Sequence, residues 1–80
     1  MSTTRLYVSI PEELVDRPLV YELVKKFEVV PNIRRANVEE HTGWIVLELS
    51  GADGSIQAAL AHLTEQGCSV NRMEGDVLEG

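Results

Sequence analysis

The side chains best suited to recognising a ligand lie together in residues 29–44, which read VVPNIRRANVEEHTGW. The amide of Asn32 both donates and accepts hydrogen bonds. The planar guanidinium group of Arg34 suits a ligand carboxylate. Arg35, on the opposite side by alternation, is expected to be an interface or solvated charge. The chemistry indicated is non-covalent binding of a small polar molecule. The other interpretation of Arg34 is a surface arginine with a cross-strand acid such as Glu48.

The residue types that usually carry catalysis or bind metals are scattered along the chain. His41, His62 and the single cysteine, Cys68, fall on three different expected elements, so they do not make the pattern of a metal site. His62 is expected to be exposed on a helix, and Cys68 to be a small buried hydrophobe. Glu39 and Glu40 point to opposite faces of a strand and cannot act as a paired acid and base. The sequence predicts no catalytic residue, no metal site and no enzyme activity.

Composition narrows the function classes further. A chain of 80 residues holds one domain, 1–80, with a core over 4–74 and an acidic tail at 75–80. The net charge of −6 opposes binding to nucleic acid or anionic membranes. No apolar run is long enough to span a bilayer and the first residues lack a signal-peptide core, which predicts a cytoplasmic location. Walker loops and iron–sulfur cysteine motifs are absent from the sequence, so no cofactor is expected.

Hydrophobic periodicity divides the chain into strands and helices. In TRLYVSI, apolar and polar residues alternate as in a strand with one buried face. Apolar residues recur at helical spacing after Pro18 and again after GADGS, where Asp53 or Ser55 can cap a helix that ends at Gly67. The HTG turn predicts a hairpin. The expected elements are a strand at 4–10, a helix at 18–28, hairpin strands at 32–40 and 44–50, a second helix up to 66 and a strand at 68–73.

This β-α-β-β-α-β order predicts an α+β, ferredoxin-like fold: a four-stranded antiparallel sheet of order 4-1-3-2 with two helices on one face. The other face stays open, and several apolar groups on an open sheet favour a contact surface. We therefore expect a homodimer with Tyr7, Arg35, Trp44 and Val46 at its interface. The predicted core consists of Leu6, Val8, Ile10, Leu23, Phe27, Ile45, Leu47, Leu49, Ile56, Leu60, Leu63 and Val70.

From about residue 5 to residue 73, the sequence resembles the NIL domain family. The resemblance rests on DRPLVYELVKKFEV, on NIRRANVEEHTGWIVLELSG and on IQAALAHLTEQGCSVNRME. The family takes its name from an Asn-Ile-Leu motif, of which Asn32 and Ile33 are present and Arg34 replaces the leucine. Such domains occur in methionine importer ATPases and in certain ferredoxins of sulfur metabolism. The resemblance implies pairing of domains and methionine binding near their interface, with Asn32 in the pocket and Val38 as a second candidate.

Two function hypotheses follow. The first is a non-catalytic regulatory module that senses a sulfur-containing amino acid through Asn32, Ile33, Arg34 and Val38. The alternative is an interaction module, free-standing or excised, that docks onto a ferredoxin, a transporter or a sulfur-metabolism enzyme without a ligand of its own. Three classes with the same architecture do not fit: RNA-recognition motifs need basic aromatic surfaces, metal chaperones need paired cysteines, and acylphosphatases need an anion-binding loop.

Overall fold

The computed structural model describes residues 1–73, and the predicted acidic tail at 75–80 lies outside them. The predicted order of strands and helices is confirmed. In chain order the elements are β1 (Ser2–Ile10), a 3-10 turn η1 (Glu12–Leu14), α1 (Leu19–Phe27), β2 (Val30–Val38), β3 (Gly43–Gly51), α2 (Asp53–Gln66) and β4 (Ser69–Arg72).

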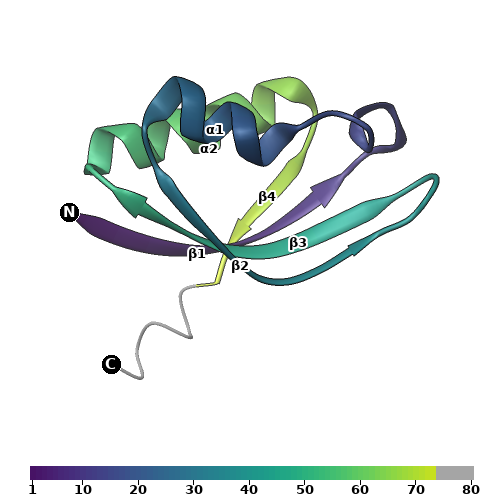
Figure 1. Cartoon of the computed structure of the whole chain (residues 1–80), viewed down its shortest axis with the longest axis horizontal. Helices are drawn as coiled ribbons and strands as arrows, with labels where there is room; N and C mark the ends of the chain where they lie inside the picture. The colour runs from purple at the N-terminus through teal and green to yellow at the C-terminus, as the bar shows by residue number, and fades with distance from the viewer. Residues whose placement is uncertain (74–80) are drawn as a thin grey trace.

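The four strands form one antiparallel sheet in the order β2-β3-β1-β4. This is the predicted order 4-1-3-2 counted from the other edge, so the ferredoxin-like α+β prediction is confirmed. Both helices lie on one side of the curved sheet (Figure 1). The central strands β1 and β3 are therefore covered by helices, whereas β2 and β4 form the two edges of the sheet.

The core lies between the helices and the sheet. Because side chains alternate along a strand, Leu6, Val8 and Ile10 of β1 all turn toward the helices and are buried. Every residue of the predicted core is part of the cluster of apolar side chains between the helices and the sheet. Most are buried in it, and Phe27, Leu60 and Val70 are partly buried and pack against it. Further buried residues are missing from the predicted core: Leu14, Leu19, Val29 and Ala59.

Leu14 was missed because it lies in a polar stretch. Its backbone N–H donates to the carbonyl of Pro11 at 2.9 Å, which closes the turn η1 and carries the leucine side chain inward. The start of α2 also differs from expectation. Ala52 occupies the N-cap without a side-chain hydrogen bond, and Asp53 accepts a hydrogen bond from the hydroxyl of Ser2 instead of capping the helix.

The end of α2 is formed as predicted, at Gly67. This residue has φ +114°, in the left-handed region that glycine adopts without strain. Its N–H group donates to the carbonyl of Thr64, and the N–H of Cys68 donates to that of Leu63. The glycine thereby lets the chain reverse directly from α2 into β4.

Candidate functional site

Strand β2, which contains the motif residues, is the most accessible strand of the sheet. One of its edges pairs with β3, and the other faces no strand within residues 1–73. All of its residues are exposed except the half-buried Pro31. The helices cover the central strands and leave β2 uncovered, so this strand offers both its side chains and its backbone groups to a binding partner.

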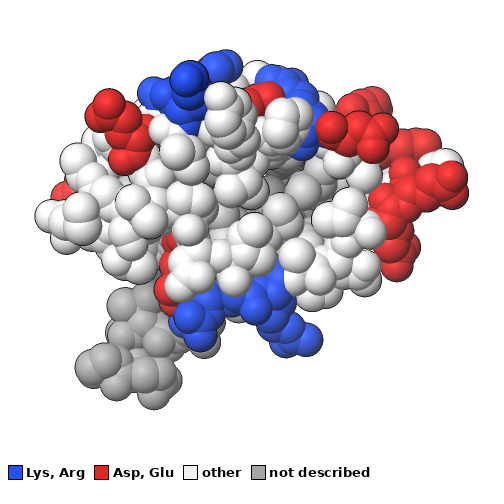
Figure 2. Space-filling view, in the orientation of Figure 1, with Lys and Arg blue, Asp and Glu red and all other residues white. Residues whose placement is uncertain are grey.

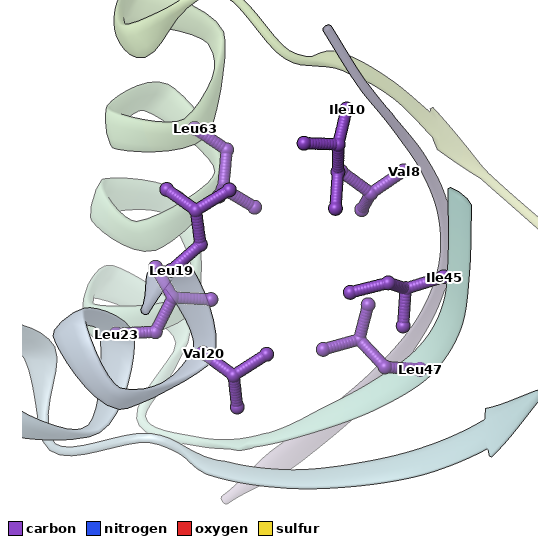
Figure 3. Close-up of a pocket in the computed structure, with 8 residues that line it drawn as sticks. All are labelled: Val8, Ile10, Leu19, Val20, Leu23, Ile45, Leu47 and Leu63. Atoms are coloured by element: carbon purple, nitrogen blue, oxygen red, sulfur yellow. The ribbon is translucent and has the colours of Figure 1, made fainter. Parts of the chain in front are cut away.

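An aliphatic gap separates α1 from the sheet beside β2. It is a small gap in the core of about 10 Å³, roughly the space of one water molecule, and all of its lining residues except Val20 are buried. Figure 3 shows side chains of the helices facing those of β1 and β3 across this space. The lining residues are Val8, Ile10, Leu19, Val20, Leu23, Ile45, Leu47 and Leu63. Because no polar group lines it, the gap offers no hydrogen bond, and it belongs to the hydrophobic core.

The register of the sheet assigns the predicted ligand residues to two faces. Ile33 lies opposite Leu47, and Val38 lies opposite Gly43, so both point to the helix side. Ile33 is 51% exposed there. Asn32 lies opposite Glu48 and points to the open face. In a single chain, the four predicted residues therefore do not converge on one pocket.

Arg34 occupies a bulge in β2. The register with β3 shifts between Ile33 and Arg35, which leaves Arg34 without a partner residue. Its positive charge acts on Glu48, the cross-strand acid considered in the sequence. The pKa of Glu48 is lowered first by a hydrogen bond from Arg5, and to a smaller extent by the charges of Arg5 and Arg34. The Arg5 Nη2 to Glu48 Oε2 distance is 2.6 Å.

Three polar side chains of β2 have no hydrogen-bond or ion-pair partner among residues 1–73, so they can bind another molecule. Asn32 makes no side-chain hydrogen bond to any residue from 1 to 73, and in the same part of the chain Arg34 and Arg35 form no ion pair. Arg35 lies opposite Val46, on the same open face as Asn32. One amide and two guanidinium groups are thus available within four consecutive residues of β2.

Of the predicted interface residues, Tyr7 and Trp44 are half-buried, Val46 is buried and Arg35 is exposed. Tyr7 and Trp44 stack with their ring centroids 5.7 Å apart, and Val46, opposite Tyr7, is only 9% exposed. Among the described residues, the large apolar side chains that are exposed are Met1, Tyr21, Val24, Val30, Ile33 and Val38. Half of these lie on β2, so the apolar surface available to a partner is concentrated at the edge of the sheet.

A polar network that the sequence did not reveal joins the two helices. Arg17 donates to both carboxylate oxygens of Glu22 and to Gln66 of α2, and His62 Nε2 lies 3.3 Å from Glu22 Oε1. The hydrogen bonds from Arg17 are the main cause of the lowered pKa of Glu22. His62 also packs against Phe27 and has a side chain only 11% exposed, so the expectation of an exposed histidine was wrong.

Within residues 1–73, the cysteine and the histidine of the β2–β3 turn lie in separate surroundings. Burial raises the pKa of the Cys68 thiol, which disfavours the nucleophilic thiolate. His41 lies in the turn between β2 and β3, where its Nδ1 is 2.6 Å from Glu12. No group of three or more His, Cys, Asp or Glu side chains in residues 1–73 could hold a metal ion. The exposed amide and guanidinium groups of β2 can take part in non-covalent recognition of a ligand or a partner.

None of the helices in the described part of the chain is both long and apolar enough to cross a membrane.

The chain is similar to part of the methionine import ATP-binding protein MetN from two bacteria. It is 30% identical to the Helicobacter pylori (strain J99) protein over 66 residues, 78% of this chain. It is 41% identical to the Symbiobacterium thermophilum protein over 58 residues, 68% of this chain. The chain spans only 20% and 18% of the length of these relatives.

A solved structure shows the same fold. It is the C-terminal domain of an ABC transporter ATP-binding protein from Enterococcus faecalis, with a TM-score of 0.77 at 18% identity. The alignment covers 88% of this chain and 82% of that one. The family model described as the NIL domain matches residues 4–72, which include β2 and almost every other described element. The chain therefore belongs to the NIL domain family.

Proposed function

We propose that this chain is a non-catalytic regulatory module that binds a small amino acid on β2, with methionine as the first candidate. The observation that carries the proposal is the set of unengaged polar groups on this strand. Asn32, Arg34 and Arg35 are exposed, and no other residue from 1 to 73 hydrogen-bonds or ion-pairs with their side chains. Methionine is chosen because the relatives at 30% and 41% identity are named as methionine import proteins.

The chemistry of an amino acid matches the charges around β2. The guanidinium groups of Arg34 and Arg35 suit its carboxylate, while the amide of Asn32 can receive or donate a further hydrogen bond. Glu48, opposite Asn32, carries negative charge for an ammonium group. Val30 lies opposite Ser50 on the same open face and is 62% exposed, which offers apolar contact to a thioether side chain.

Self-association is part of this proposal. An exposed edge strand readily pairs with another strand, and β2 exposes Val30, Ile33 and Val38 along that edge. A small domain also gains stability from further burial, since its own core buries a limited share of its surface. We infer a homodimer that acts in the cytoplasm, with the ligand bound close to the contact between the two copies.

A second candidate function is docking onto a larger protein without a ligand. The observation that favours it is the length of the relatives, in which a region similar to this chain makes up about a fifth of a longer protein. In that case the exposed side chains of β2 contact a transporter, a ferredoxin or a sulfur-metabolism enzyme, and the arginines pair with acids of that partner.

Thermal unfolding with added amino acids separates the two functions. A ligand at about 100 times its dissociation constant stabilises a folded protein by about 2.7 kcal/mol, which raises the unfolding temperature of a domain of this size by several degrees. Methionine, homocysteine and cysteine are tested at millimolar concentration, with leucine as an apolar control that lacks sulfur. A shift with methionine that leucine does not give supports the sensor, and no shift with any sulfur amino acid argues for docking.

A further inference from the structure

The open face of the sheet presents an aromatic ring on each of its two central strands. Tyr7 of β1 and Trp44 of β3 stack with an angle of 16° between their planes, and each side chain stays half-exposed. The registers of the sheet place the two rings in neighbouring rows that run across the strands. The row of Trp44 contains Asn37 and Ser9, and the row of Tyr7 contains Arg35, Val46 and Asn71.

Polar side chains on the two edge strands flank this aromatic pair. Asn37 of β2 and Asn71 of β4 are exposed, and neither amide makes a hydrogen bond to a side chain or backbone group of residues 1–73. Arg35 is likewise exposed and forms no ion pair within the described chain. Glu48, the acid of the adjoining row, is already bound by Arg5. The rings are therefore surrounded by amide groups and by one positive charge that lack a partner in residues 1–73.

The free positive charge of this face contrasts with the net charge of the chain, which is −6. Figure 2 shows a group of basic side chains on the underside of the molecule, which in Figure 1 is the side of the sheet away from the helices. Acidic side chains gather toward the right end of the same view. A positive charge beside two aromatic rings is complementary to a planar molecule that carries an anion. The negative charge of the whole chain opposes a long polyanion, so a ligand with a single phosphate fits better than a nucleic-acid strand.

We propose that the open face of the sheet binds a purine mononucleotide. The base stacks on the exposed part of the Tyr7–Trp44 pair, as bases stack on aromatic side chains of other binding sheets. Asn37, directly opposite Trp44, exchanges hydrogen bonds with the edge of the base. Arg35, two residues away and about 7 Å along the strand, binds the phosphate. This ligand goes beyond the amino acid proposed above, with which it shares Arg35 alone.

The amides favour a nucleobase over a simple aromatic acid. Benzoate, for example, can contact the rings and pair with Arg35, but the edge of its ring offers no hydrogen bond to Asn37 or Asn71. A purine presents both donors and acceptors along its edge, which matches an amide that also has both. The two asparagines lie on opposite sides of the aromatic pair, so a base that covers the rings has an amide at either side.

Quenching of tryptophan fluorescence by adenosine monophosphate (AMP) tests this inference on the unmodified protein. Trp44 is the only tryptophan of the chain, and a base stacked on its ring quenches the emission. We expect quenching that saturates with AMP, and binding about tenfold or more weaker for adenosine, ribose 5-phosphate and benzoate. Ribose 5-phosphate that binds as tightly as AMP would indicate a plain anion site and overturn the inference. A single-stranded oligonucleotide that binds where AMP does not, or quenching by AMP that never saturates, would also overturn it.

Variants tested by titration calorimetry locate the site without relying on fluorescence. Trp44→Leu and Arg35→Gln should each weaken AMP binding about tenfold or more, and Trp44→Phe, which keeps a ring, should retain most of the affinity. Arg72→Gln is the matched control: it removes the same charge from β4 at a residue opposite Leu6, on the helix side, and should bind AMP normally. Arg35 is exposed, so Arg35→Gln remains a test even if Trp44→Leu does not fold. An unchanged affinity of Arg35→Gln would refute the assigned phosphate contact.

Methionine binding separates this inference from the proposed function. Trp44→Leu should lose AMP and keep methionine, because the indole is not part of the amino-acid site. A protein that binds methionine but not AMP refutes the nucleotide site and leaves the sensor in place. A protein that binds AMP but not methionine supports the nucleotide site and refutes the sensor.

Discussion

Truncating two buried leucines tests whether the core contains the gap beside α1 that the structure shows. Leu49 is 0% exposed and does not line the gap, whereas Leu23, 1% exposed, does. Leu49→Ala leaves a closed void, so we expect a loss of about 4–5 kcal/mol, near the upper end for such changes. Leu23 already borders a gap, so Leu23→Ala removes fewer contacts and should cost about 2–3 kcal/mol.

Urea denaturation followed by far-ultraviolet circular dichroism measures both losses, at a concentration where the protein is monomeric. A domain of 80 residues has a total stability of about 4–12 kcal/mol, so Leu49→Ala removes a large part of it. If too little folded protein remains, the comparison is repeated with Leu49→Val and Leu23→Val, for which the same order is expected. An equal or larger loss at Leu23 would show that the gap is filled in solution, contrary to the structure.

Three further results are expected. In titration calorimetry, Asn32→Ala should weaken the binding of methionine by about 1–3 kcal/mol. Arg34→Leu should shift the ligand preference of the protein toward apolar ligands. An unchanged affinity of Asn32→Ala would place the site elsewhere. Glu22→Gln should lower the melting temperature at neutral pH. Because the pKa of Glu22 is lowered in the folded state, its contribution is complete above about pH 5 and is lost as the pH falls through that lowered pKa, so the two proteins should converge in acid. Gly67→Ala should destabilise by about 1 kcal/mol or more, since alanine is strained at φ +114°; no change in the denaturation midpoint would contradict the left-handed end of α2.

Local patterns were sufficient to predict the sheet and the helices. The alternation of Leu6, Val8 and Ile10 and the helical recurrence around Leu23 each report one buried face, and the order of such segments determines the fold. Leu14 escaped prediction because a single 3-10 turn has no periodicity. The bulge at Arg34 escaped because no residue type in β2 marks it, and it is visible only as a change of register against β3.

The residues of the proposed site come from the sequence alone, whereas their arrangement required the structure. The sequence indicated Asn32, Ile33 and Arg34, yet their separation onto two faces depends on the pairing of β2 with β3. The exposure of β2 depends on how far α1 reaches over the sheet, which is a matter of tertiary packing. The ties of Arg17 and His62 to Glu22 could not be foreseen either, because they join segments that are distant in the chain.

The stacked pair of Tyr7 and Trp44 allows the open face to be followed by tryptophan fluorescence. Trp44 is the only tryptophan of the chain, so the whole indole emission comes from the open face, at the hairpin end of β3. A partner that excludes water from this face shifts the emission maximum to shorter wavelength. A partner at the outer edge of β2 leaves the indole half-exposed and the emission maximum unchanged. Trp44 is therefore a fluorescent probe of the open face and not of the outer edge of β2. If the protein associates while its emission maximum stays constant, the contact is at the edge.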